Sequence, residues 1–191
     1  FYRNSGSSGG AFAYRNLGTA TVSMNDVIFE ENTATNYGPA IYFATAPADY
    51  VYIDNATFIN NQQNSTQTID YKGGGAVAIL GGGGATRDVW FTNSTFSNNT
   101  ATNFGGAIFT TAIGRVRLDN VSFTENSAGQ LGGAITMGNA KIVGTNVIFE
   151  DNTGQYSGGA ISLQEAQPGL LLLDKVLMTG NSSPQGYGGA I

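Results

Sequence analysis

Two short signatures alternate along the whole chain, and this alternation constrains the fold more than any other feature. The first is Phe-x-x-Asn, with Met in place of Phe in the last copy. The second is Gly-Gly-Ala followed by an apolar residue, with Gly-Pro-Ala in one copy. The spacing from one such Ala to the next runs from 26 to 36 residues. Repeats of this length are typical of solenoids, in which each repeat stacks on its neighbours to bury a continuous core.

The residues before each Phe alternate in polarity with a period of two. Apolar residues recur seven, five and two positions before it, as at Val51, Ile53 and Ala56. This pattern predicts strands with one buried face. The parity slips by one at pairs such as Asp54-Asn55, whose residue types favour turns. We therefore predict a strand, a bend and a second strand that ends at the Asn, followed by a variable loop and a third strand after Gly-Gly-Ala.

Three short strands per repeat predict an all-β fold, a parallel β-helix of about seven coils. At about 4.8 Å per coil, seven coils would span roughly 30–35 Å. Equivalent residues would stack, with Phe inside and Asn at the turn, where stacked amides can form hydrogen-bonded ladders. The stacked residues would be Phe29, Asn32, Phe58, Asn61, Phe96, Asn99, Phe123, Asn126, Phe149 and Asn152.

Two details of the Gly-Gly-Ala signature stay open at the level of sequence. Its first Gly indicates either a bend with positive φ or a close approach between backbones. Its Ala can face inward or outward, because the bend hides the parity. We expect residues 1–191 to form a single β-helix segment that is a fragment of a longer repeat array.

Composition excludes several classes of function. The chain has no Cys or His, so thiol nucleophiles, disulfides, imidazole bases and the usual zinc sites are excluded. Its net charge of −5 argues against a nucleic-acid partner, which requires a basic surface. The most apolar run, Leu170–Leu173, is far shorter than the roughly 20 residues of a transmembrane helix. We expect no cofactor, no metal and no transmembrane segment.

The alternating Phe-x-x-Asn and Gly-Gly-Ala-Ile motifs resemble the repeat of the chlamydial polymorphic membrane proteins. The resemblance covers essentially the whole chain. It implies a right-handed parallel β-helix, a passenger domain that is secreted as an autotransporter and acts as an adhesin. It also implies an extracellular or cell-surface location.

Catalysis is the alternative that the fold class raises, because some parallel β-helices are polysaccharide lyases or hydrolases. The best carboxylate cluster is Glu125 and Asp151, at the same position of neighbouring repeats, with Glu150 beside them. A pair of this kind can share acid–base work. Other repeats carry Asn or Gly at that position, which favours solvated turn residues. We therefore expect no enzymatic activity and no catalytic residue.

Six Asn residues lie in glycosylation sequons, a mild excess over chance. They are Asn55, Asn64, Asn93, Asn98, Asn120 and Asn181. Three of them occupy the same bend and would form a row of glycans in a secreted eukaryotic protein. The alternative is that Asn serves the turn and Ser or Thr serves the strand.

The outward positions of the strand before each bend form the strongest candidate surface. This row combines the only Trp with arginines and apolar residues, types that are enriched at interfaces. Its candidate contact residues are Tyr50, Tyr52, Trp90, Arg115, Arg117, Val143, Leu170 and Leu172. The alternative is ordinary β-propensity on an outer face.

These observations predict a non-catalytic structural or adhesive module of a secreted or cell-surface protein. The partner would be a protein or glycan at the cell surface, or further copies of the chain in a filament. A carbohydrate-binding module that uses Tyr50, Tyr52 and Trp90 as stacking platforms is a further alternative.

Overall fold

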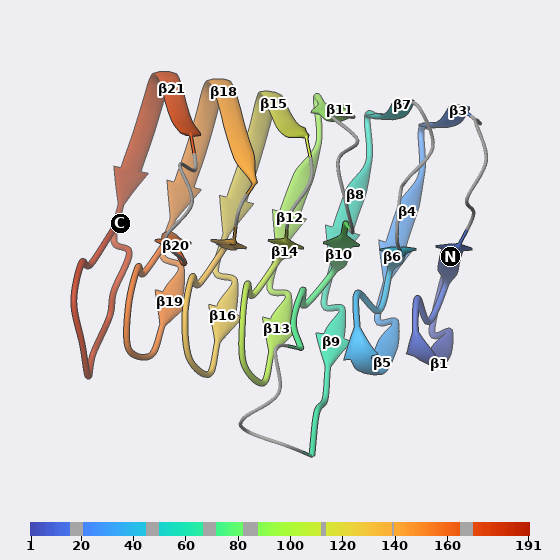
Figure 1. The fold of residues 1–191 in the computed structure, drawn as a ribbon, viewed down its shortest axis with the longest axis horizontal. Helices are drawn as coiled ribbons and strands as arrows, with labels where there is room; N and C mark the ends of the chain where they lie inside the picture. Colours follow the sequence, from blue (N-terminus) through green and yellow to red (C-terminus); the bar gives the residue numbers. More distant parts are fainter. Residues whose placement is uncertain are drawn as a thin grey trace.

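The chain forms a parallel β-solenoid of about five turns, seen in a computed structural model. The structure describes residues 1–15, 21–44, 50–66, 72–81, 88–111, 114–138, 140–164 and 170–191. All regular structure in these ranges is β-strand, and no helix occurs there. The coils lie side by side along the long axis, with the two ends of the chain at opposite ends of the rod (Figure 1).

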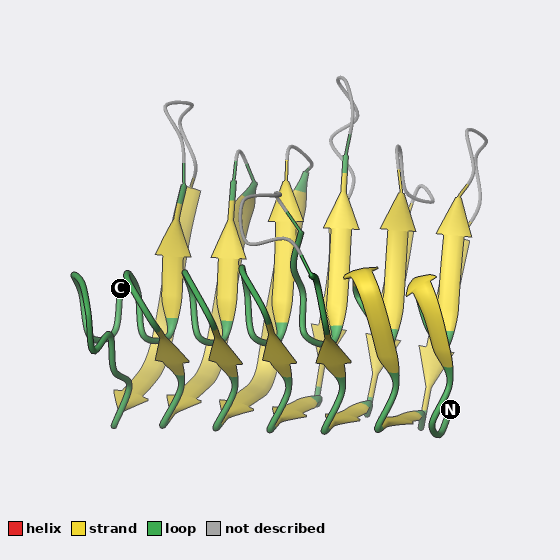
Figure 2. Cartoon of the chain, turned by 90° about the horizontal axis from the view of Figure 1, so that it is seen from below, coloured by secondary structure: helices red, strands yellow, loops and turns green. Residues whose placement is uncertain are grey.

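Three parallel sheets run along the solenoid (Figure 2), and we name them by their repeat signatures. The Gly sheet contains β2 (Phe12–Arg15), β6 (Ile41–Ala44), β10 (Val77–Leu80), β14 (Ile108–Thr111), β17 (Ile135–Met137) and β20 (Ile161–Leu163). The Asn sheet contains β1 (Ser5–Ser8), β5 (Thr33–Tyr37), β9 (Gln62–Gln63), β13 (Thr100–Ala101), β16 (Ser127–Ala128) and β19 (Thr153–Gly154).

The Phe sheet has two arms that meet at the predicted bend. The first arm comprises β3 (Thr21–Asn25), β7 (Tyr50–Asp54) and β11 (Asp88–Thr92), and the second comprises β4 (Ile28–Glu30), β8 (Thr57–Ile59) and β12 (Thr95–Ser97). In later coils the two arms are joined in the long strands β15 (Arg115–Thr124), β18 (Lys141–Glu150) and β21 (Leu170–Thr179). The bend itself is confirmed by positive φ angles at Asp26, Asn55, Asn93, Asn120, Asn146 and Lys175.

The expected seven coils with three strands each are not confirmed. The Gly and Asn sheets each have six described strands, which is five steps from first to last. The number of strands per coil also varies, because the Phe sheet contributes two strands in the early coils and one in the later coils. The handedness of the helix stays a prediction.

The interpretation of the segment after each Asn as a variable loop is wrong, because this segment forms the Asn sheet. Its strands are mostly two residues long and pair in register, as in Thr100↔Ser127 and Ala101↔Ala128. A small residue such as Ala101 or Ala128 is buried at the second position. The sequence carried that signal, but two residues are too few to show a period.

The predicted Phe stack is confirmed. Phe29, Phe58, Phe96, Phe123 and Phe149 are fully buried. Each pairs in register with the next. Their ring centroids are 4.4–5.0 Å apart and the rings are nearly parallel. The spacing matches the distance between neighbouring strands, so one aromatic column fills the core along the axis.

The predicted Asn ladder is also confirmed, and it satisfies every polar atom of its buried amides. Asn126 shows the pattern. Its Nδ2 donates to Asn152 Oδ1 at 3.0 Å and to the Phe96 carbonyl at 2.9 Å. Its Oδ1 accepts from both the backbone N and the Nδ2 of Asn99, at 3.1 and 3.0 Å. The Asn column therefore links each coil to the coils on either side of it.

The two glycines of the Gly-Gly-Ala signature have different roles, and the Ala faces inward. Gly105 has φ of 61°, and a Cβ there would lie 2.1 Å from the Ile108 carbonyl oxygen. Gly106 meets the next coil, where a Cβ would lie 2.0 Å from the Gly133 carbonyl oxygen. The first Gly thus makes the bend, and the second allows close stacking of coils. Ala107 is fully buried.

Removal of one ring from the Phe stack should lower the stability of the fold. We predict that Phe123→Ala lowers the free energy of unfolding by about 3–5 kcal/mol, because it leaves a cavity in a column that is packed on both sides. A urea titration followed by circular dichroism measures the loss. Ser122→Ala, at an outward position of the same strand, is the matched control and should change stability by less than about 0.5 kcal/mol. Equal stability of the two variants would contradict the stacking interpretation.

Candidate contact surface

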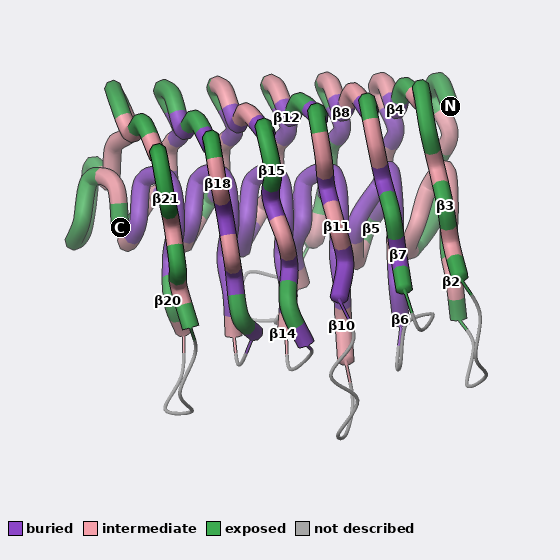
Figure 3. The backbone as a smooth tube through the Cα atoms, turned by 90° about the horizontal axis from the view of Figure 1, so that it is seen from above, coloured by how far each residue is buried: buried purple, intermediate pink, exposed green. Residues whose placement is uncertain are grey.

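The register of the Phe sheet gathers the predicted outward row on one face of its first arm. One column pairs Tyr50, Asp88, Arg115, Lys141 and Leu170 across β7, β11, β15, β18 and β21. The second column pairs Tyr52, Trp90, Arg117, Val143 and Leu172 across the same strands. We call these ten residues the contact face. Figure 3 shows these strands side by side, with many exposed or half-buried positions.

An aromatic cluster forms one end of the contact face. The Tyr52 and Trp90 ring centroids are 4.7 Å apart at an interplanar angle of 19°. The centroid of the Tyr50 ring lies 5.8 Å from that of Trp90 and 6.2 Å from that of Tyr52. Tyr50 and Tyr52 remain 50% and 42% exposed. Aromatic rings with this much open surface are platforms on which a partner can pack.

Asp88 organises the middle of the contact face. The residue is only 7% exposed, and its carboxylate accepts hydrogen bonds from two arginines. The bond from Arg115 Nε to Oδ1 measures 3.0 Å, and the bond from Arg117 Nε to Oδ2 measures 2.7 Å. Burial alone would raise the pKa of Asp88, but the hydrogen bonds and charges of Arg117 and Arg115 outweigh it and lower that pKa.

Arg117 links the charged centre to the aromatic cluster. Its guanidinium carbon lies 5.6 Å from the centroid of the Trp90 ring, within the range of a cation–π contact. Trp90 pairs in register with Tyr52 on one side and with Arg117 on the other. The expected proximity of Trp90 to both residues is therefore confirmed, and the contact is made within one chain.

Sequence reasoning missed the role of Asp88. Its place in the outward row was visible, and so was the Arg at the same position of the next repeat. That pairing predicts an ion pair between neighbouring strands. The bond to Arg117, two residues further along the strand, depends on side-chain conformation and leaves no signal in the repeat.

The far end of the contact face is apolar. Leu170 and Leu172 on β21 are exposed, and Val143 on β18 is half-buried. Ile148 and Leu177 extend this surface onto the second arm of the Phe sheet, where they pair in register and are also exposed. The contact face thus passes from aromatic through cationic to apolar along the axis.

The carboxylates considered for catalysis lie elsewhere, on an exposed corner. Glu125 and Asp151 both have positive φ, at 55° and 52°, and both are exposed, as is Glu150. They occupy the corner between the Phe and Asn sheets. Within the described ranges, no group of three or more acidic residues is placed to hold a metal ion.

The sequon residues divide between exposed bends and the Asn ladder. Asn55, Asn93 and Asn120 are exposed on the same bend, where Asn120 Nδ2 donates to Asn93 Oδ1 at 2.9 Å. All three have positive φ, which Asn tolerates well, so the turn alone accounts for their residue type. Asn181 instead donates to the Phe149 carbonyl as a member of the ladder.

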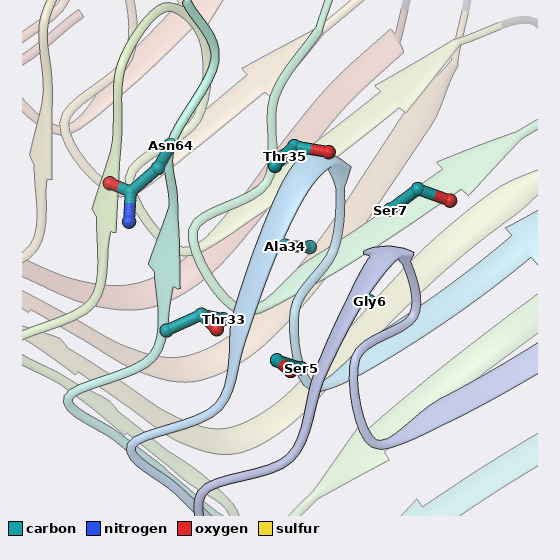
Figure 4. A pocket seen from close by; sticks show the side chains of 7 residues that line it. All are labelled: Ser5, Gly6, Ser7, Thr33, Ala34, Thr35 and Asn64. Carbon is teal, nitrogen blue, oxygen red and sulfur yellow. The ribbon is translucent and has the colours of Figure 1, made fainter.

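The described residues line two surface hollows whose side chains are mostly polar. One of about 270 Å³ runs along the bend and is lined by residues that include Asn93, Asn120 and Asn146. The other, of about 320 Å³, lies beside β1 and β5 and includes the sequon residue Asn64 (Figure 4). Asn98 is exposed on a corner with positive φ. Neither hollow is lined by a charged side chain, so acid–base chemistry has no obvious group there.

The two ion pairs of Asp88 with Arg115 and Arg117 make the free energy of unfolding depend on pH. An Asp in an unfolded chain has a pKa of about 3.9. Because the folded pKa of Asp88 is lower, its stabilising contribution is present above about pH 4 and is lost as pH falls through the folded pKa. We predict that Asp88→Asn lowers the free energy of unfolding at neutral pH and flattens its decline below about pH 4.

Urea titrations at several pH values measure this effect. Asp119→Asn is the control, because Asp119 is exposed on the same sheet and has no ion-pair partner among the described residues. It should retain the decline seen in the wild type. If Asp88→Asn declines as steeply as the wild type, the arginines do not hold Asp88 in its charged form.

No helix in the described part of the chain is long and apolar enough to cross a membrane. Residues 93–111, 120–136 and 146–164 each match the sequence model of the Chlamydia polymorphic membrane protein repeat. The chain is also 28% identical to the probable autotransporter YfaL of Escherichia coli (strain K12), over 72% of this chain and 13% of that protein. It therefore spans about 13% of the length of that relative. No solved structure matches the chain.

Each matched stretch begins at or next to a bend Asn, passes through Phe-x-x-Asn and ends in or just after a strand of the Gly sheet. The matches thus cover the elements that form the bend, the Phe stack, the Asn ladder and the Gly turn. The chain contains repeats of the Chlamydia polymorphic membrane protein type, as its sequence motifs predicted.

Proposed function

We propose that the chain is a non-catalytic segment of an extracellular, cell-surface β-helix and serves as a rigid adhesive module. The contact face binds a surface partner, either a protein, a glycan or another copy of the chain. The proposal includes the right-handed winding and the autotransporter route that the family resemblance implies, within a longer repeat array. Glycosylation of the exposed sequons and growth into a filament remain predictions.

Similarity to known proteins supports the location. The matched repeat is named for a membrane protein of Chlamydia, and the Escherichia coli relative is named a probable autotransporter. Both names point to the bacterial surface. A solenoid of stacked coils also suits a module that must hold a binding surface away from the cell, since each coil is bonded to its neighbours along three sheets.

The contact face is the observation that carries the proposal. It places two half-exposed Tyr rings, one Trp and two arginines on adjacent strands of a regular sheet. The few residues that dominate binding at protein interfaces are enriched in Trp, Tyr and Arg. Strands fixed by the sheet hold these groups in place, so little side-chain order has to be gained on binding.

The enzymatic alternative rests on Glu125, Glu150 and Asp151, which are all exposed. None of the three lines either of the two hollows described above, whereas catalytic carboxylates act on a substrate held in a cleft. Incubation with plant, algal and bacterial polysaccharides, followed by assays for new reducing ends or unsaturated products, tests this alternative. Product formation that Glu125→Gln abolishes would replace the adhesive proposal with a catalytic one.

The adhesive proposal predicts that the contact face mediates attachment. Beads coated with the chain should attach to cells or to one another, and the double change Trp90→Ser and Arg117→Ser should reduce this at least several-fold. These changes remove one aromatic ring and one guanidinium from the contact face, and both side chains point outward, so the core packing is kept. Flow adhesion assays and light scattering measure the two forms of attachment.

A matched control lies at Tyr2 and Arg3, where the guanidinium stacks 4.7 Å from the Tyr ring and Arg3 bonds Glu31. The change Tyr2→Ser and Arg3→Ser removes the same groups outside the contact face and should leave attachment unchanged. Equal attachment of the two double variants would contradict the proposal. Circular dichroism establishes that both remain folded.

A further inference from the structure

The contact face carries a surplus of positive charge on an acidic protein. Within the contact face, Arg115, Arg117 and Lys141 contribute three cations against the single carboxylate of Asp88. The next outward column of the same sheet, at the bend, carries the carboxylates of Asp54, Asp119 and Asp174, so the positive charge is concentrated at the end of the strands away from the bend. The whole chain has a net charge of −5. Separation of charge of this kind on a surface favours a partner with negative charge at this place.

The two guanidiniums are held in place but remain free to bind. Each uses only its Nε to reach Asp88, and no other hydrogen bond of Arg115 or Arg117 side chains occurs in the described part of the structure. The Nη1 and Nη2 groups of both residues therefore keep their donors. Their side chains are 47% and 31% exposed. A guanidinium whose Nε is bonded to Asp88 can still donate from Nη1 and Nη2 to a carboxylate or sulfate of a ligand.

The aromatic cluster adds a surface for rings beside these cations. Tyr52 and Trp90 lie on neighbouring strands, and their rings stack at 4.7 Å, close to the strand spacing. The ring planes are therefore roughly perpendicular to the solenoid axis. On its other side, Tyr52 pairs in register with Ser23 on β3, which has a much shorter side chain, and Tyr52 is 42% exposed. A flat ring can stack there against Tyr52.

We infer that the contact face binds an acidic polysaccharide that lies along the solenoid axis from β3 to β18. Sugar rings pack against the aromatic cluster, and the carboxylate or sulfate groups bind the free edges of Arg115 and Arg117 and the ammonium of Lys141. The repeat of the ligand follows the repeat of the coils. This inference rests on the proposed adhesive function and narrows its partner to one chemical class.

Biolayer interferometry with the folded chain tests the inference. The probes are heparin as a sulfated glycan, polygalacturonate as a carboxylated glycan and dextran as a neutral glycan. We expect both acidic glycans to bind, with affinity that falls as salt rises, and dextran to bind far more weakly. Equal binding of dextran, or no binding of either acidic glycan, would overturn the inference.

Two variants separate the cations from the rings. The double variant Arg115→Gln, Lys141→Gln keeps the hydrogen bond between Arg117 and Asp88. It should lower the affinity for both acidic glycans about tenfold or more. Arg3→Gln with Lys175→Gln removes the same charge from exposed sites outside the face and should leave affinity within about twofold. Tyr50→Ser with Tyr52→Ser should weaken binding without changing its salt dependence. If the first two variants bind alike, the inference is wrong.

Two further experiments distinguish a failure of the inferred partner class from a failure of the proposed adhesive function. Tighter binding of single-stranded DNA than of either glycan would assign the face to nucleic acid, since that polymer also offers rings and anions, and would overturn the inference. Attachment of the wild type to cells that have been stripped of acidic glycans would also overturn it, while the proposed adhesion stands. Loss of attachment on stripped cells supports both.

Discussion

The buried Asn ladder is the interaction on which the rest of the structure depends. A buried amide without partners lowers stability, so each of these fully buried side chains needs protein partners for its four hydrogen bonds. The structure provides them only when Asn residues of successive coils lie directly above one another. Asn126, for example, bonds Asn99 on one side and Asn152 on the other. A coil displaced by one residue would leave these groups unpaired and turn every side chain of its strands to the opposite face.

The register of the strands determines both how the core packs and which side chains meet on the surface. The Phe column fills the core only if Phe123 lies over Phe149, and the same alignment places Trp90 between Tyr52 and Arg117 on the outside. The outward positions differ from repeat to repeat, because no core or ladder constraint acts on them. The outward positions of the strands are therefore free to vary between repeats, while the core and the ladder fix where those positions lie.

Much of the fold was predictable because its strongest signals recur. The burial of Phe29 and its equivalents, the bend at Asn55 and the gathering of Tyr52, Trp90 and Arg117 on one face all follow from period-two alternation and repeat alignment. Other features were not predictable. Strands of two residues such as β13 have too few positions to show a period, and the number of strands in a coil depends on whether the bend interrupts the ladder.

The candidate site shows the same division between backbone and side chain. Its residues could be placed on one face from the sequence, and so could the pairing of Asp88 with Arg115 on the next strand. The second hydrogen bond to Asp88, from Arg117, could not be predicted, because it depends on the conformation of a long side chain two residues further along that strand. The inward direction of Ala107 was hidden for a related reason. The preceding Gly105 adopts positive φ, which breaks the alternation from which side-chain direction is inferred.

Hydrogen exchange of the ladder amides tests the central claim most directly. The backbone N–H groups of Asn99 and Asn126 donate to side chains of the next coil and belong to no strand of their own. If the ladder sets the register, NMR should show them protected as strongly as the amides of the Phe sheet, and Asn126→Ala should abolish the protection of Asn99. Exchange at the rate of exposed loop amides in the wild type would contradict the account.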